Sequence, residues 1–201
     1  MKKNMFKALS LLALSFLFAF SAHAQAKMPM PSPSASVSQL VGFTEITIDY
    51  SSPGVKGRKV FGELEKWGVT WRAGANAATK VTFSTGVKIG DKDLRAGSYT
   101  LFITPMENED WVVHINSKGN SVFTYMKDGK IDEAALAADD AVSIKVKPVK
   151  MPEPTERLMY YVSAGDNKVG EVGMLWADYY IAFDVDTKAD AIVEGIKKTL
   201  N

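Results

Sequence analysis

The chain has 201 residues, with 24 Lys and Arg, 23 Asp and Glu, no Cys and a formal net charge of +1. This length suits one domain with one hydrophobic core, and 46% hydrophobic with 23% charged residues excludes a wholly disordered chain. The lack of Cys excludes disulfides, thiolate zinc sites and cysteine nucleophiles. Two His argue against a multi-histidine metal site, and the near-neutral charge gives no electrostatic reason to expect nucleic acid.

Residues 1–24 have charged residues, an apolar stretch and a cleavage site in the order typical of a secretory signal peptide. Three Lys accompany an apolar stretch, Ala8–Phe20, that is too short to span a bilayer. Ala22-His23-Ala24 supplies the small residues of a cleavage site, so we expect cleavage before Gln25 and export to the periplasm or the extracellular space. A short membrane anchor or a buried helix is the alternative. Cleavage would leave His114 as the only histidine.

Residues 25–36 follow the predicted cleavage site and contain three Pro and several Ser. Pro lacks a backbone N–H and Ser does not build a core, so this segment predicts a flexible, extended tether. A polyproline ligand for a partner is the alternative.

Residues 37–186 predict an all-β domain. Apolar residues alternate with polar ones, as in Glu45-Ile46-Thr47-Ile48-Asp49-Tyr50, which is typical of a strand with one buried face. About nine such runs separated by turn residues predict an antiparallel β-sandwich, either jelly-roll or Ig-like, since strand order does not follow from a list of strands. The runs lie at Phe43–Tyr50, Lys80–Phe83, Val87–Ile89, Tyr99–Ile103, Trp111–Ile115, Val142–Val146, Leu158–Val162, Val172–Trp176 and Tyr179–Val185.

Two segments depart from this alternation. Ile131–Asp140 is Ala-rich with acids at both ends, which predicts either helical turns or a surface loop. Residues 187–201 predict a C-terminal helix, because Thr187 and Asp190 have capping-box spacing and the apolar residues that follow share one face. We expect this helix to pack on the domain and to cover a sheet edge or end. Its apolar residues are Ile192, Val193, Ile196 and Leu200.

The segment Tyr50–Thr79 is the main candidate for function. It is long, punctuated by Gly and rich in Trp and Arg, and loops on a sandwich commonly carry binding residues. Trp can stack on flat apolar groups, and the planar Arg guanidinium can donate two hydrogen bonds to a carboxylate or a phosphate. Asn can form hydrogen bonds with hydroxyl groups. We therefore predict a non-catalytic binding module for a glycan, an anionic small molecule or a peptide. The candidate ligand-binding residues are Arg58, Trp71, Arg72 and Asn76.

A structural role for these residues is the alternative. Trp67 and Trp71 would then close one end of the core, since Trp is usually mostly buried. The two Arg would pair with Glu63, Glu65 or Asp49, and Asn76 would bond the backbone of its own loop.

Motifs for catalysis are weak. His114 lies in a predicted strand without a recognisable nucleophile, and the sequence has neither G-x-S-x-G nor a glycine-rich phosphate loop. The run Glu107-Asn108-Glu109-Asp110 offers oxygen ligands but lacks EF-hand spacing, so we predict a solvated hairpin, no metal and no cofactor. A hydrolase using a carboxylate or His114 is one alternative function. A structural or interaction protein that presents a sheet edge or the C-terminal helix is the other.

Three runs resemble a known family. They are Tyr50-Ser51-Ser52-Pro53-Gly54-Val55-Lys56-Gly57-Arg58, Trp71-Arg72-Ala73-Gly74-Ala75-Asn76-Ala77-Ala78-Thr79 and Leu94-Arg95-Ala96-Gly97-Ser98-Tyr99-Thr100-Leu101. They look like the domain-of-unknown-function family 2911, whose members are secreted or periplasmic proteins of bacterial envelopes. The resemblance covers roughly Ser36–Val185. It implies export and a β-rich fold, and it brings no established reaction.

Overall fold

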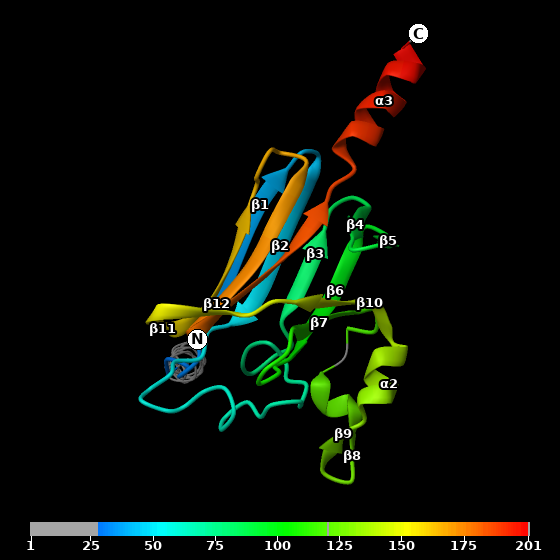
Figure 1. Cartoon of the computed structure of the whole chain (residues 1–201). Helices are drawn as coiled ribbons and strands as arrows, with labels where there is room; N and C mark the ends of the chain where they lie inside the picture. Colours follow the sequence, from blue (N-terminus) through cyan, green and yellow to red (C-terminus); the bar gives the residue numbers. More distant parts are fainter. Residues whose placement is uncertain (1–27, 120, 201) are drawn as a thin grey trace, which may run out of the picture. The chain divides into compact units, whose positions relative to one another are not determined.

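The structure is a computed structural model that describes residues 28–119 and 121–200; the predicted signal peptide, residues 1–24, lies outside them. The chain divides into two units, Met1–Met30 and Pro31–Asn201. Every strand and helix labelled in Figure 1 belongs to the second unit.

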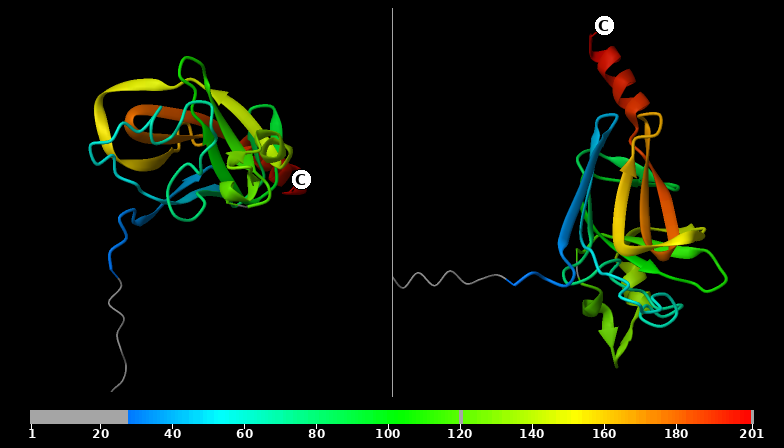
Figure 2. Two further views of the ribbon diagram at one scale, coloured as in Figure 1. Left: turned by 90° about the horizontal axis from the view of Figure 1, so that it is seen from below. Right: turned by 90° about the vertical axis from the view of Figure 1, so that its left-hand side faces the viewer.

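Two antiparallel sheets form a sandwich, which confirms the predicted fold class. The six-stranded sheet has the order β1-β2-β3-β6-β7-β10 and the four-stranded sheet the order β11-β12-β4-β5. Figure 2 shows β1 and the β11–β12 ribbon as parts of separate layers. The strands are β1 (Ser34–Val41), β2 (Thr44–Ser51), β3 (Lys80–Phe83), β4 (Val87–Ile89), β5 (Lys92–Leu94), β6 (Gly97–Thr104), β7 (Trp111–Asn116), β10 (Asp140–Val146), β11 (Val149–Ser163) and β12 (Val169–Asp186).

The core lies between the sheets, where the apolar members of each alternating run meet. Ile46 and Ile48 of β2 are fully buried, while Glu45 and Asp49 beside them are exposed. Each fully buried aliphatic side chain of this kind stabilises the fold by roughly 1.5–3 kcal/mol. The alternation that predicted the strands is therefore also the pattern that builds the core.

The connection between β7 and β10 forms a small subdomain on the other face of the six-stranded sheet. It contains η1 (Val122–Tyr125), the hairpin β8 (Met126–Lys127) and β9 (Lys130–Ile131), and α2 (Glu133–Ala138). Asp132 caps α2 by accepting a bond from the Ala135 N–H at 3.0 Å, so the Ala-rich segment forms helical turns. A second apolar cluster joins this subdomain to β6; its members are Phe102, Val122, Tyr125 and Leu136.

The last three residues of the predicted tether belong to a strand. Ser34 to Ser36 belong to β1 and pair with the end of β2, and the Pro33 carbonyl accepts a bond from the Ser52 N–H at 2.8 Å. The boundary placed at residue 37 was therefore wrong by three residues. The reason is that the backbone edge of β2 needs hydrogen-bond partners, and strand pairing uses backbone groups that Ser supplies as well as any residue.

The strand β12 turns back on itself. The Tyr180 hydroxyl lies 3.2 Å from Glu171 Oε1, although nine residues of extended strand span about 30 Å. Ala177 lies between them with a φ of 50°, in the left-handed region that permits a sharp reversal. The two runs predicted at 172–176 and 179–185 are the two halves of this ribbon.

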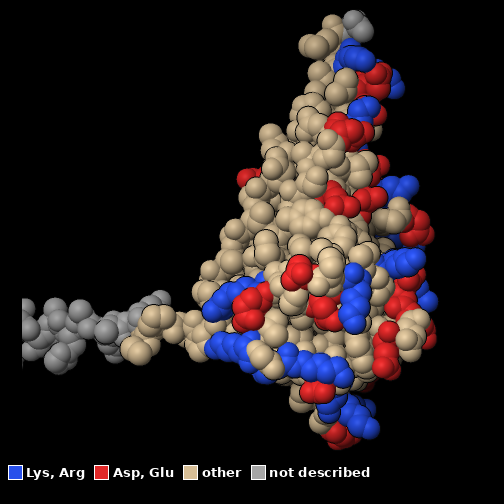
Figure 3. All heavy atoms as spheres, turned by 60° about the vertical axis from the view of Figure 1, so that its left-hand side comes forward, with Lys and Arg blue, Asp and Glu red and all other residues tan. Residues whose placement is uncertain are grey.

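The C-terminal helix α3 (Ala189–Leu200) begins two residues later than predicted. The Thr187 hydroxyl donates to the Lys168 carbonyl at 2.7 Å instead of capping the helix. Only Ala189 of α3 is buried, Ile192 and Val193 are half-buried, and Ile196 and Leu200 are 48% and 80% exposed, so the packing we expected does not extend to the second half of the helix. Figure 3 shows charged side chains along one side of this helix. Among residues 28–119 and 121–200, no helix is long and apolar enough to cross a membrane.

Two buried threonines offer a matched test of the packing. Thr79 donates its hydroxyl to the Ala73 carbonyl at 2.9 Å, whereas the buried Thr100 hydroxyl has no hydrogen-bond partner among the described residues. We expect Thr79→Val to lower the free energy of unfolding by about 1 kcal/mol, and Thr100→Val to leave it unchanged or raise it. Urea denaturation of both variants measures this difference, and a larger loss for Thr100→Val would contradict it.

Candidate functional site

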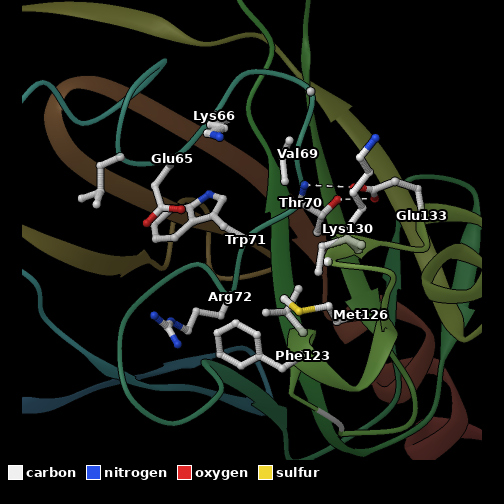
Figure 4. A pocket seen from close by; sticks show the side chains of 15 residues that line it. Glu65, Lys66, Val69, Thr70, Trp71, Arg72, Phe123, Met126, Lys130 and Glu133 are labelled. Carbon is white, nitrogen blue, oxygen red and sulfur yellow. Dashed lines mark hydrogen bonds between the residues drawn. The ribbon is translucent and has the colours of Figure 1, made fainter.

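A pocket of about 630 Å³ opens between two connections of the sandwich. One wall is the loop from β2 to β3, and the other is the subdomain between β7 and β10 (Figure 4). Its lining is mostly apolar, with a few charged side chains. The lining residues are Leu64, Glu65, Lys66, Gly68, Val69, Thr70, Trp71, Arg72, Val122, Phe123, Met126, Gly129, Lys130, Ile131 and Glu133.

Backbone pairing fixes the first wall to the sheet. The Trp71 N–H donates to the Ile103 carbonyl at 2.9 Å, and the Ile103 N–H donates back to the Trp71 carbonyl at 3.1 Å. The Gly68 N–H donates to the Pro105 carbonyl at 2.7 Å. The segment that carries the pocket residues is therefore held at both ends against β6 and the turn after it.

Aromatic packing fixes the rest of this loop. The Phe61 ring lies 4.7 Å from the Trp111 ring and 5.9 Å from the Trp176 ring, measured between centroids. Gly62 follows with a φ of 91°, and a Cβ there would lie 2.6 Å from Trp67 Nε1, so only glycine permits the Trp67 ring to lie over this backbone. The loop is thus part of the hydrophobic core at this end of the sandwich.

Two contacts join the walls of the pocket. The Arg72 guanidinium carbon lies 5.1 Å from the centre of the Phe123 ring, and Thr70 bonds Glu133 through its N–H at 3.1 Å and its hydroxyl at 2.5 Å. Figure 4 shows that these two contacts lie in different parts of the pocket. Phe123 is 54% exposed, so its ring offers contact area to a bound molecule.

Three side chains of the pocket carry polar groups that make no hydrogen bond within the part of the chain that the structure describes. Trp71 is 4% exposed, and its Nε1–H makes no hydrogen bond, but this atom is buried and does not face the open cavity. The Arg72 guanidinium makes no hydrogen bond and no ion pair, and the Glu65 carboxyl makes no hydrogen bond. Arg72 and Glu65 are half-buried and line the pocket, so a polar group supplied from outside can reach both of them.

The Glu65 carboxyl is largely withdrawn from water. This desolvation raises its pKa from 4.5 to about 7, against the smaller opposing attraction of Arg72 and Arg58. Near neutral pH a substantial fraction of Glu65 is therefore uncharged and able to donate a hydrogen bond. A raised pKa in a pocket is a common property of functional carboxyl groups.

The structure divides the four predicted site residues into two pairs. Trp71 and Arg72 line the pocket. Arg58 donates to the carbonyl of Gly54 at 2.6 Å and to that of Val55 at 3.0 Å, outside this pocket. Exposed Asn76 has a φ of 55° and donates to the Ser32 carbonyl at 2.9 Å.

His114 is buried in a hydrogen-bonded series of side chains. Its Nδ1 lies 2.7 Å from Asp140 Oδ2, and its Nε2 lies 2.9 Å from the Thr104 hydroxyl. This hydroxyl lies 2.5 Å from that of Thr70, which in turn bonds Glu133. We call these five residues the relay.

The relay has a hydroxyl, an imidazole and a carboxylate in the order used by hydrolytic triads. Thr104 and His114 are not among the residues that line the pocket, and the Thr104 hydroxyl is engaged by Thr70. Among residues 28–119 and 121–200, no group of three or more His, Asp or Glu is placed to hold a metal ion.

Sequence reasoning missed the second wall of the pocket. Phe123, Met126 and Glu133 belong to the connection between β7 and β10, which gave no periodic signal beyond the Ala-rich stretch. Glu65 entered only as an ion-pair partner for Arg. Neither feature has a local signature, because both depend on contacts between segments far apart in the sequence.

Comparison with known proteins identifies one family. The family model described as "Protein of unknown function (DUF2911)" matches residues 32–185. No curated protein and no solved structure matches the chain. Because the match spans most of the sequence and nearly all of the sandwich, the chain belongs to the DUF2911 family.

Proposed function

We propose that the protein is an exported, non-catalytic binding module for a small anionic molecule with an apolar body, held in the pocket beside Trp71 and Arg72. Export is supported by the charge, apolar stretch and cleavage-site pattern of residues 1–24. The observation that carries the proposal is that Arg72 and Glu65, which make no side-chain hydrogen bond, line a mostly apolar pocket.

The polar groups favour an anion. The Arg72 guanidinium is a donor, and Glu65 becomes a second donor when it is protonated. Lys66 and Lys130 add positive charge to the lining. A carboxylate, phosphate or sulfonate accepts several such bonds at once, and charge-assisted bonds are the stronger kind.

The size and lining favour a small molecule with apolar groups over a glycan or a long peptide. A volume of about 630 Å³ is typical of small-ligand sites. The side chains of Leu64, Val69, Phe123 and Met126 are each more than 40% exposed and offer apolar contact area. An apolar body would cover these side chains while its acidic group meets Arg72.

The first prediction concerns Arg72. We expect 8-anilinonaphthalene-1-sulfonate, an aromatic sulfonate, to bind the native chain, and Arg72→Gln to weaken this binding by about tenfold or more, because a charge-assisted bond is lost. Phe123→Ala should weaken it through lost apolar contact. Fluorescence titration at constant pH and salt measures both effects.

Arg95→Gln is the matched control, since Arg95 is an exposed arginine outside the pocket. Near-ultraviolet circular dichroism should show that each variant keeps its tertiary packing. Equal affinity of the Arg72 and Arg95 variants for the sulfonate would contradict the proposal, as would an absence of binding to the native chain.

The second prediction concerns Glu65. Its pKa of about 7 means that raising the pH from 6 to 8 places a negative charge beside the bound anion, so affinity for the sulfonate should fall. Glu65→Gln should remove this part of the pH dependence. Titrations at pH 6 and pH 8 for both proteins test it.

The same variant has a ligand-free control. The pKa of Glu65 is higher in the folded chain than its usual 4.5, so the native chain loses stability as pH rises from about 4.5 through about 7. Glu65→Gln should therefore gain stability relative to the native chain at pH 8 but not at pH 4. The same difference at both pH values would contradict the burial of this carboxyl.

A further inference from the structure

The relay connects the pocket wall to a buried acid–base pair. It runs from Glu133 of α2 through Thr70 and Thr104 to His114 of β7, and ends at Asp140, the first residue of β10. The side chains of His114 and Asp140 are 9% and 5% exposed. A change of protonation at the buried end can therefore reach the pocket through these bonds as well as through its charge.

The bonds fix the direction in which the hydroxyl protons point. Glu133 as a carboxylate only accepts, so the Thr70 hydroxyl donates to it. The Thr70 oxygen then accepts from the Thr104 hydroxyl, which leaves the Thr104 oxygen to accept from Nε2–H of His114. Since Nε2 carries a proton, the 2.7 Å contact between Nδ1 and Asp140 Oδ2 requires one further proton between those two atoms.

Loss of that further proton makes this arrangement untenable. If Nδ1 keeps its proton for the Asp140 carboxylate, Nε2 becomes an acceptor and the Thr104 hydroxyl turns toward it. The Thr70 hydroxyl must then donate to Thr104, because two oxygens 2.5 Å apart need a proton between them. Glu133 loses its bond from the Thr70 hydroxyl and keeps the one from the Thr70 N–H.

We propose that the relay is a proton-operated switch of the pocket: protonated, it satisfies Glu133 and favours anion binding, and deprotonated, it reverses and weakens that binding. This inference rests on the proposed function. The reversed state leaves a Glu133 oxygen without its hydroxyl donor at the pocket wall, and it removes one positive charge from the buried pair. Both changes oppose an anionic ligand, so binding the anion and binding the proton favour each other.

Other polar and charged side chains lie beside the relay. Asn116 of β7 donates to Asp140 Oδ1 at 3.2 Å, and Tyr125 of η1 donates to Asp139 Oδ2 at 2.9 Å. Lys118 lies 3.8 Å from Asp139, the C-cap of α2. Glu65 titrates in the pocket independently of these bonds, so the test is made in the Glu65→Gln background.

Affinity for 8-anilinonaphthalene-1-sulfonate is measured from pH 5 to pH 9 in three full-length proteins: Glu65→Gln alone, with Thr104→Val, and with Thr100→Val. Glu65→Gln alone should lose about fivefold in affinity as pH rises, a typical coupling. Thr104→Val breaks the relay at its middle, so the part of the loss that the hydrogen bonds transmit should disappear and the total loss should be smaller than in Glu65→Gln alone. Thr100→Val makes the same substitution on the same strand at a hydroxyl without a partner, so the loss should remain. An equal pH dependence in all three proteins would overturn the proposal.

A ligand-free measurement separates this proposal from the proposed function. In the Glu65→Gln protein, the amide resonance of Thr70, whose N–H bonds Glu133, should shift with the same midpoint as the His114 imidazole nitrogens. If the sulfonate fails to bind at any pH, the proposed function fails and this titration still decides whether the relay reverses. A Thr70 amide that ignores the His114 titration would overturn the switch even where the sulfonate binds.

Discussion

The packing of Phe61 among tryptophans is the contact on which the candidate site depends. Its ring centre lies within 6.3 Å of the ring centres of Trp67, Trp71, Trp111 and Trp176, which are all four tryptophans of the sequence. Aromatic pairs of this kind contribute about 0.5–1.5 kcal/mol each beyond the area they bury. A connection that would otherwise be a mobile loop becomes a rigid wall with Arg72 at a fixed place.

The pocket exists because two separate connections meet at one end of the sandwich. The loop before β3 supplies the unpaired polar groups, and the subdomain after β7 supplies Phe123, Met126 and Glu133. The sandwich holds each wall, and the walls touch through Arg72 with Phe123 and through Thr70 with Glu133.

The sandwich was predictable because period-two alternation is a local property, and β2 shows it directly in its buried and exposed residues. The candidate loop was also predictable, since its Trp and Arg content stands out against the strands. The roles within it were not, because an Arg that bonds its own loop and an Arg that faces a pocket look alike in sequence. Arg58 and Arg72 are that pair.

His114 shows a different limit. Alternation correctly places it opposite Trp111, Val113 and Ile115, but the subdomain that covers this second face is not visible in the alternation itself. The pKa of Glu65 has the same origin, since desolvation depends on what the folded chain places around the carboxyl. The burial of both faces of β7 and the desolvation of Glu65 both depend on tertiary contacts.

The exposure of α3 has a consequence for how the chain unfolds. A helix of 12 residues is marginal in water without tertiary support, and only Ala189 of this helix is buried. Its backbone hydrogen bonds therefore open by local fraying, and the free energy of this opening is far below the free energy of unfolding the sheets. We therefore expect the amides of the second half of α3 to exchange much faster than those of the paired strands.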